Sequence, residues 1–223
     1  MSLATPTMRS MTDRYAATGP EAQFEPGSRS RVLRNLLGIR SVREMETAES
    51  IALVSATRKA IEETGADQRF SADHIRGLHR MWLEKIYPWA GQYRSVNLSK
   101  GDFPFAAASQ IPRLMERLER EQLREYTPCR VGPVGDEVQL GLAAVHVELI
   151  LIHPFRDGNG RWARLVATLM ALQAGLPPLD FSGVKGRERK RYFQAVHAAL
   201  AGNLAPMMLV FERIVARTQR KRP

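Results

Sequence analysis

The chain has 223 residues and a formal net charge of +10, from 33 Lys plus Arg against 23 Asp plus Glu. This length suits one well-cored domain with short extensions, and a composition of 44% apolar and 25% charged residues excludes wholesale disorder. The basic balance favours polyanionic partners such as nucleotides, nucleic acid or an acidic protein, and it equally fits a plain Arg-rich surface. The single cysteine, Cys129, excludes an internal disulfide framework and any multi-cysteine metal site.

The two ends of the chain differ from its middle in composition. Residues 1–30 are rich in Gly, Pro, Ser and Thr and predict a mobile or loosely docked arm, followed by one domain over 31–218 and a basic tail at 219–223. The arm lacks the continuous apolar stretch of a signal peptide. The most apolar run, 140–152, is interrupted by His146 and Glu148 and is too short to span a bilayer. We therefore expect a cytoplasmic protein that does not enter the membrane.

Helical signals follow one another from residue 41 onwards. Ser41-Val42-Arg43-Glu44 is a capping box that opens a helix ending at Gly65, and Ser71 caps a second helix that ends before Pro88. Further helices are predicted over 107–126, 136–153, between Asp157 and Gly175, and over 187–201 and 204–217. The segment 136–153 is so apolar that we expect it at the centre of the core. Only 92–105 is predicted to be extended, so the pattern predicts an all-α fold with one β-hairpin.

The stretch from His153 to Arg164, HPFRDGNGRWAR, concentrates polar chemistry in twelve positions. A buried helix ends at its first residue, and a tight loop with two glycines leads into a new helix. Glycines let backbone N–H groups converge, and a helix N-terminus adds unsatisfied donors, so the loop predicts an anion-binding nest. Arg161 and Arg164 are three residues apart on one helix face, where both can reach phosphate oxygens.

Two further side chains of this stretch suggest a reaction. Asp157 would repel a bare phosphate, but it suits a Mg²⁺ ion that bridges phosphates. His153 can accept a proton near neutral pH. A capped turn with surface arginines would account for a lone Gly-x-Gly, but it would not account for all these groups within twelve residues. The stretch therefore predicts a site for phosphate and Mg²⁺ beside a group that can accept a proton.

The same string resembles the signature of the Fic family, His-x-Phe-x-Asp/Glu-Gly-Asn-Gly-Arg-x-x-Arg, and matches it at every specified position. The segment 86–94, IYPWAGQYR, is similar to the family's segment leading into its β-hairpin flap, and 175–178 resembles the stretch after the motif helix. The resemblance implies a Fic-type helical bundle with a central motif helix pair and one hairpin flap. It also implies AMPylation, the transfer of AMP from ATP to a Ser, Thr or Tyr hydroxyl of a target protein.

The resemblance implies a role for each residue of the motif. His153 would be the general base on the target hydroxyl, Asp157 would coordinate Mg²⁺, and Phe155 would be a core residue that holds the loop. Nucleotide-binding residues would be Asp157, Gly158, Asn159, Gly160, Arg161 and Arg164, with the two arginines at the β/γ end that leaves as pyrophosphate. Family members with Lys in place of Gly160 are associated with phosphorylation, so this glycine favours adenylylation.

Two segments outside the motif have implied roles as well. The flap, about 95–106, would dock an extended target segment through Lys100, Gly101, Phe103 and Phe105 near its tip. The alternative for the two phenylalanines is that they are ordinary hairpin core residues. Tyr192 and Phe193 lie where the family tends to place aromatic residues that contact adenine.

The resemblance to small stand-alone Fic toxins implies an antitoxin partner and, as one possible target, a type II topoisomerase subunit. Many Fic proteins carry an inhibitory pattern, Ser/Thr-x-x-x-Glu-Gly/Asn, whose glutamate pairs with the second motif arginine, here Arg164. No glutamate of this chain has that context, so a separate antitoxin would supply the inhibitory glutamate or the enzyme would be unrestrained.

Two other functions stay open: a nucleotide- or nucleic-acid-binding protein without catalysis, and a phosphotransferase or ATP hydrolase using the same pocket. Nucleic acid is the less favoured partner, because no recognition helix or RNA-binding signature is present.

Overall fold

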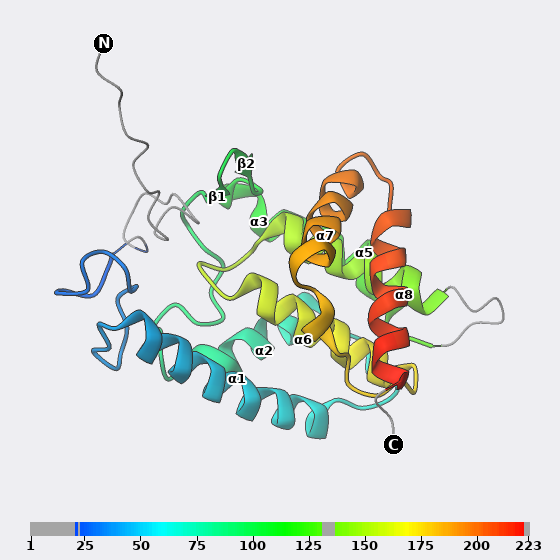
Figure 1. Ribbon diagram of the computed structural model, residues 1–223, viewed down its shortest axis with the longest axis horizontal. Coiled ribbons are helices and arrows are strands. Elements are labelled where there is room, and N and C mark those ends of the chain that lie inside the picture. Colours follow the sequence, from blue (N-terminus) through cyan, green and yellow to red (C-terminus); the bar gives the residue numbers. More distant parts are fainter. Residues whose placement is uncertain (1–20, 22, 131–136, 221–223) are drawn as a thin grey trace, which may run out of the picture.

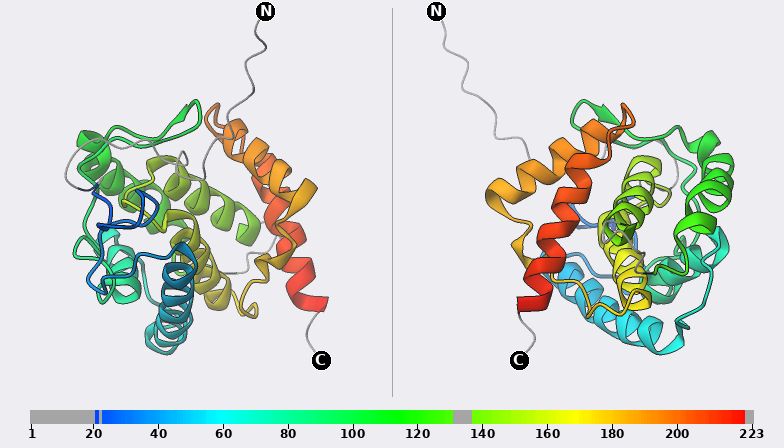
Figure 2. Two further views of the ribbon diagram at one scale, coloured as in Figure 1. Left: turned by 60° about the vertical axis from the view of Figure 1, so that its left-hand side comes forward. Right: turned by 90° about the vertical axis from the view of Figure 1, so that its right-hand side faces the viewer.

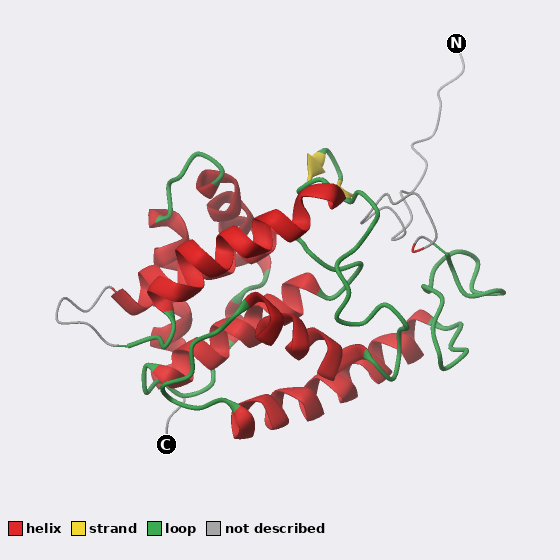
Figure 3. Cartoon of the chain, turned by 180° about the vertical axis from the view of Figure 1, so that it is seen from behind, coloured by secondary structure: helices red, strands yellow, loops and turns green. Residues whose placement is uncertain are grey.

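Helices account for most of the described residues, and one short hairpin lies among them (Figure 3). The computed structural model describes residues 21, 23–130 and 137–220, so the predicted arm at 1–30 and tail at 219–223 fall partly outside the described residues. The long helices are α1 (Val42–Glu63), α2 (Ala72–Leu83), α3 (Ile111–Leu118), α5 (Glu137–Ile152), α6 (Asn159–Gln173), α7 (Gly186–Ala199) and α8 (Ala205–Arg220). The hairpin pairs β1 (Ser99–Lys100) with β2 (Phe103–Pro104) in antiparallel register.

The predicted helix starts are confirmed at the level of single hydrogen bonds. The Ser41 hydroxyl accepts the Glu44 N–H at 3.5 Å at the start of α1, and the Ser71 hydroxyl accepts the His74 N–H at 3.0 Å at the start of α2. Each cap satisfies one of the orphan donors of a first helical turn. Local sequence therefore fixes where both helices begin.

One predicted helix, 107–126, is divided in the structure. It opens with a 3-10 turn (Ala108–Gln110), continues as α3, widens into a π-helical turn (Glu119–Leu123) and ends as the short α4 (Arg124–Tyr126). Pro112 lies in the first turn of α3, where its missing N–H would have no helical partner anyway. The prediction was right about the helical path and wrong about its regularity.

The extended segment predicted over 92–105 is also shorter than expected. Only two residues on each side pair as strands, and residues 92–98 form an irregular connection. Arg94 explains the difference, because it ties this connection to the loop between α5 and α6 rather than to a neighbouring strand.

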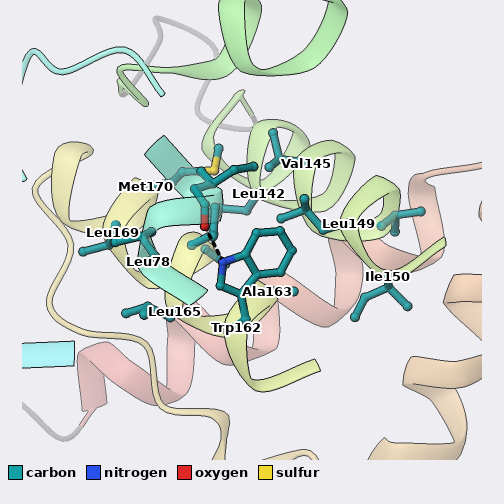
Figure 4. Packing of buried hydrophobic residues seen from close by; sticks show 14 of the residues in the cluster. Leu78, Leu142, Val145, Leu149, Ile150, Trp162, Ala163, Leu165, Leu169 and Met170 are labelled. Atoms are coloured by element: carbon teal, nitrogen blue, oxygen red, sulfur yellow. Dashed lines mark hydrogen bonds between the residues drawn. The ribbon is translucent and has the colours of Figure 1, made fainter. Parts of the chain in front are cut away.

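Helices α5 and α6 pack against each other in the middle of the molecule (Figures 1 and 2). Helices α1 and α2 cover α6 on one side, and α7 and α8 cover α5 on the other. Trp162 of α6 is completely buried, and its indole N–H donates to the Ile75 carbonyl of α2 at 2.6 Å. Figure 4 shows this indole among apolar side chains of α2, α5 and α6, including Leu78, Leu142, Leu149, Leu165 and Met170. Packing in the core therefore fixes the position of α6, the helix that begins at the polar loop.

Within the described part of the chain, no helix is both long and apolar enough to cross a bilayer.

Candidate functional site

The loop between α5 and α6 is built by two residues with left-handed backbone. His153 has φ +52° directly after α5, and Gly158 has φ +82° directly before α6. A Cβ atom at Gly158 would lie 2.6 Å from Cζ3 of Trp82, so both the torsion and the close approach require glycine. The Gly158 carbonyl accepts the Trp162 N–H at 2.9 Å and starts the α6 ladder. The N-terminus of α6 therefore opens onto this loop.

Asn159 and Phe155 hold the inside of the loop. The Asn159 amide accepts the Phe155 N–H at 2.9 Å and donates to the Phe155 carbonyl at 2.8 Å. Both side chains are buried, and the Phe155 ring is fully inaccessible, which confirms it as a core residue. Because the Asn159 side chain is committed to the loop, the donor that it can offer an anion is its backbone N–H.

His79 of α2 supports the loop from below. Its Nδ1 accepts the Gly91 N–H at 3.0 Å, and its Nε2 donates to the Asp157 carbonyl at 3.1 Å. The ring stacks on Phe155 with 3.7 Å between centroids. Burial lowers the pKa of His79 to about 4, so the ring is neutral with its proton on Nε2. No sequence motif marks this residue, because its partners lie 12 and 78 positions away.

Asp157 and Arg161 lie at the mouth of the loop. One carboxylate oxygen of Asp157 accepts the Gly158 N–H at 2.6 Å, and the other lies 3.9 Å from Nη2 of Arg161. Both side chains are about one-third exposed, at 33% and 35%. A carboxylate and a guanidinium thus meet beside the N-terminus of α6.

Arg161 also makes an ion pair that the sequence did not predict. Its Nη1 lies 2.6 Å from Oε2 of Glu49, a residue of α1 that is 4% exposed. The nearby carboxylates of Glu49 and Asp157 raise the pKa of Arg161 above its ordinary value, although burial opposes them. A separation of 112 positions left no local signal for this contact.

Arg164 has different surroundings. Its guanidinium carbon lies 5.6 Å from the centre of the Phe181 ring, and no carboxylate of the described residues forms an ion pair with it. The two motif arginines share a helix face, as predicted, but only Arg161 is held by carboxylates.

His153 is 5% exposed and lies under the flap. Its Nδ1 donates to the Ile150 carbonyl at 3.1 Å, so the second nitrogen, Nε2, carries the lone pair. The Phe105 ring stacks on the imidazole with 3.6 Å between centroids. Burial, helped by the positive charges of Arg94 and Lys100, lowers the pKa of His153 to about 3. The imidazole is therefore neutral at physiological pH, as a proton acceptor must be.

The flap reaches across to α7 (Figure 2). The Lys100 ammonium lies 4.0 Å from the centre of the Phe193 ring, and the Phe103 ring lies 4.9 Å from that of His197. Gly101 forms the turn between the strands with φ +59°. Three predicted flap residues, Lys100, Phe103 and Phe105, thus border the His153 site.

The two aromatic residues predicted to contact adenine have unlike surroundings. Phe193 is partly exposed beside Lys100, whereas Tyr192 is buried and its hydroxyl donates to Nε2 of His146 at 2.8 Å. Of the two rings, Phe193 lies at the flap and Tyr192 lies in the core of α5 and α7.

Arg94 joins the flap to the loop. Its guanidinium is 2% exposed and donates to the carbonyl groups of Ile152 and His153 on one side, at 3.3 and 2.7 Å. On the other side it donates to those of Val96 and Ala106, both at 2.6 Å. Arg94 belongs to the segment predicted to lead into the flap, but the sequence carries no local signal for these four carbonyl contacts.

The buried histidines give a prediction for the pH dependence of stability. Burial lowers the pKa of both His79 and His146 from 6.5 to about 4 in the folded chain. The unfolded chain therefore binds more protons between these values, and stability is fully present above about pH 6.5 and lost as the pH falls towards 4. The expected loss is at most about 3 kcal/mol per histidine. Urea unfolding followed by circular dichroism at pH 5 to 7.5 measures it, in a window above most carboxylate titrations.

His79→Gln is the control for this measurement, because an amide can donate and accept but does not titrate in the window. We expect a shallower pH dependence in this variant. An identical slope in the variant and the unmodified chain would contradict the assignment.

Comparisons with known proteins point to one family. A model of the Fic/DOC family matches residues 69–171, which include the flap, the loop and all but the last two residues of α6. The chain is 30% identical over 210 residues to the "Probable protein adenylyltransferase Fic" of Escherichia coli K12, covering 92% of this chain and 97% of that protein. It is 32% identical over 184 residues to the "Probable protein adenylyltransferase y4lH" of Sinorhizobium fredii, covering 82% and 91%.

Solved structures agree with the sequence relatives. The BepC protein of Bartonella tribocorum, crystallised with bound AMPPNP, matches with a TM-score of 0.66 and 26% identity over 82% of this chain and 92% of that one. An N-terminal Fic domain from Bartonella quintana with bound ADP matches with a TM-score of 0.67 and 26% identity over 86% and 92%. The predicted helical fold with one flap is therefore confirmed.

Proposed function

The chain belongs to the Fic/DOC family, and from this membership we propose that it is a protein adenylyltransferase that transfers AMP from ATP to a Ser, Thr or Tyr hydroxyl of a target protein. The observation that supports this most is the loop between α5 and α6. Between His153 and Asn159 it holds a neutral imidazole, a carboxylate and the start of a helix, with two arginines on the first turns of that helix. Curated relatives that bear the name protein adenylyltransferase support the same reaction.

ATP would bind with its phosphates at the N-terminus of α6. The backbone N–H groups of Asn159 and Gly160, in the first turn of α6, and the positive end of the helix dipole suit an anion. Arg164 would hold the terminal phosphates, since no carboxylate of the described residues competes for it, and Arg161 would act beside Asp157. The related Bartonella structures with bound AMPPNP and ADP support an adenine nucleotide as the ligand.

The metal would be Mg²⁺, held by Asp157 together with phosphate oxygens. No group of three His, Cys, Asp or Glu side chains in the described residues could hold an ion alone. A single carboxylate at the mouth nevertheless suits Mg²⁺, which keeps waters and shares its remaining ligands with a substrate's phosphates. When bound, the ion would neutralise phosphate charge.

His153 would act as the base through Nε2, because Nδ1 is committed to the Ile150 carbonyl. The target hydroxyl gives its proton to Nε2, and its oxygen forms a bond to the α-phosphorus. The bond from this phosphorus to the bridging oxygen breaks, and pyrophosphate leaves with its charge stabilised by Arg164 and the N–H groups of α6. Positioning and charge stabilisation supply most of the catalysis in such a displacement.

The flap would align the target. An extended target segment would add to the hairpin near Lys100, Gly101, Phe103 and Phe105, where a side chain inserted beside Phe105 would meet the imidazole. Phe193 would contact adenine, and buried Tyr192 would support it from behind.

We propose that the protein acts in the cytoplasm as the toxin of a toxin–antitoxin pair, and that its target is a type II topoisomerase subunit. No described carboxylate pairs with Arg164, so an inhibitory glutamate for that arginine would come from a separate antitoxin.

Intact-protein mass spectrometry tests the proposed reaction. The chain is incubated with MgATP labelled in adenosine and a bacterial lysate, and the released phosphate is identified. We expect an added AMP moiety on a protein and release of pyrophosphate. Orthophosphate with no adenosine label on any protein would replace the proposal with a hydrolase or phosphotransferase.

Exchanging Asp157 for Asn is expected to raise the Mg²⁺ concentration needed for half-maximal transfer. The amide keeps the size of the side chain but removes the charge of one hard oxygen ligand. A Mg²⁺ titration of initial rates at saturating ATP measures the shift. An unchanged requirement would remove Asp157 from the metal site.

A further inference from the structure

Glu49 is a buried carboxylate outside the motif with both oxygens in use. Oε2 meets Arg161 at 2.6 Å, and Oε1 accepts the Tyr87 hydroxyl at 2.7 Å. The pKa of Tyr87 is raised by burial and by the charge of Glu49, so the phenol keeps its proton and donates. A buried charge is tolerated when it is paired and hydrogen-bonded in this way. Glu49 is therefore fixed in position from two sides.

Arg161 is fixed in turn by three contacts. Besides the Glu49 ion pair, its guanidinium carbon lies 4.7 Å from the centre of the Trp82 ring. The Trp82 indole N–H donates to the Glu49 backbone carbonyl at 2.9 Å, which links ring and carboxylate into one unit. The opposite side of the guanidinium faces Asp157, with 3.9 Å between Nη2 and Oδ2.

A guanidinium has five N–H donors in a rigid fork, so one corner can be anchored while the others remain directed elsewhere. Here the anchored corner is Nη1, and Nη2 is turned towards Asp157 at the mouth of the loop. An arginine held in its working orientation before the ligand arrives loses less freedom on binding.

We propose that Glu49 is a positioning residue of this site: it holds Arg161 in the orientation in which that arginine contacts the phosphates of ATP beside Asp157. The inference rests on the proposed function, because it takes ATP as the ligand. With this role for Glu49, helix α1 contributes to the site although it lies outside the matched 69–171 segment.

Glu49→Gln tests the proposal, because the amide keeps the shape and removes the charge. Removing a negative charge near an anion site would strengthen ATP binding, because it relieves Coulomb repulsion. Loss of the orientation of Arg161 would instead weaken ATP binding. We expect the Kd for MgATP, measured by calorimetry, to rise about ten-fold, and kcat/KM for AMP transfer to fall with it. The matched control is Glu46→Gln, an exposed glutamate one turn earlier on α1, which should change neither constant.

A double-mutant cycle separates positioning from general support. In an Arg161→Met background, Glu49→Gln should cause no further rise in the Kd, because its effect acts through the missing guanidinium. If Glu49→Gln does not fold, Tyr87→Phe takes its place, since it removes one tether of the carboxylate and should weaken ATP binding about two- to three-fold with the same dependence on Arg161.

Three outcomes would overturn the proposal. Tighter ATP binding or faster transfer in Glu49→Gln would mean that the carboxylate withholds Arg161 from the ligand. An equal loss in the Arg161→Met background would mean that Glu49 only supports the fold. An unchanged Kd would mean that Arg161 finds its orientation without it. If the unmodified chain binds MgATP but transfers no AMP, the proposed function fails, and the binding constants still decide the role of Glu49.

Discussion

Replacing His153 with Ala is expected to lower the rate of AMP transfer by about 10²- to 10⁴-fold, the range associated with loss of a general base. The imidazole is neutral, and Nδ1 is occupied by the Ile150 carbonyl, so Nε2 is the acceptor that the variant loses. The phosphate-binding N–H groups and Arg164 remain, and the Kd for MgATP should change little. Single-turnover transfer of labelled AMP and calorimetric ATP binding measure the two quantities on the same preparation.

A histidine outside the site provides the comparison. His74 lies in the first turn of α2 and packs on Phe70, so His74→Ala removes an imidazole without touching the loop. We expect this variant to transfer AMP at the rate of the unmodified chain. If His153→Ala also transferred AMP at a comparable rate, the base would have to be another group.

Gly158→Ala is expected to have the second large effect, on stability and activity together. A left-handed backbone at a non-glycine residue costs about 1–3 kcal/mol, and the added Cβ would meet the Trp82 ring at 2.6 Å. Because Trp82 also contacts Arg161 and the Glu49 carbonyl, a shift of the ring would displace the arginine as well as the loop. The free energy of unfolding measured in urea should fall, and the Kd for MgATP should rise.

Gly160 is the matched control within the same motif. It has an ordinary helical backbone, and a Cβ there would meet no atom within 4 Å. Gly160→Ala should therefore leave the free energy of unfolding unchanged or slightly improved, since alanine is the better helix former. Equal destabilisation by the two substitutions would show that the close approach at Gly158 is not what matters.

The helices and the motif loop could be predicted from sequence because their determinants are local. Serine caps, apolar periodicity and the Gly-Asn-Gly turn each act within a few residues, and the structure has α1, α2 and α6 beginning where these signals lie. The family signature also drew attention to the residues that surround His153.

The supports of the loop could not be predicted, because each acts across a long stretch of chain. Glu49 reaches Arg161, His79 reaches the Asp157 carbonyl, and Arg94 reaches the His153 carbonyl only after the helices have packed. The local sequence does not distinguish a buried Glu or His from an exposed one, and only the tertiary contacts show whether the side chain is buried. The length of the hairpin was overestimated, because the alternating polarity of 92–98 is compatible with a strand. The tertiary contacts of Arg94 that hold this segment in an irregular path leave no signal in the sequence.

The guanidinium of Arg94 anchors the root of the flap to the loop that carries His153. Val96 and Ala106, at the two ends of the hairpin, are bound to the same cation as the carbonyl group of His153. The root of the flap and His153 are therefore held by the same side chain, and residues 99–104 extend from this root to α7, where Lys100 and Phe103 contact Phe193 and His197. Under the proposed docking role, sequence changes in residues 99–104 would alter which protein is modified without moving His153. Target choice would then depend on residues 99–104, whereas the position of His153 depends on Arg94.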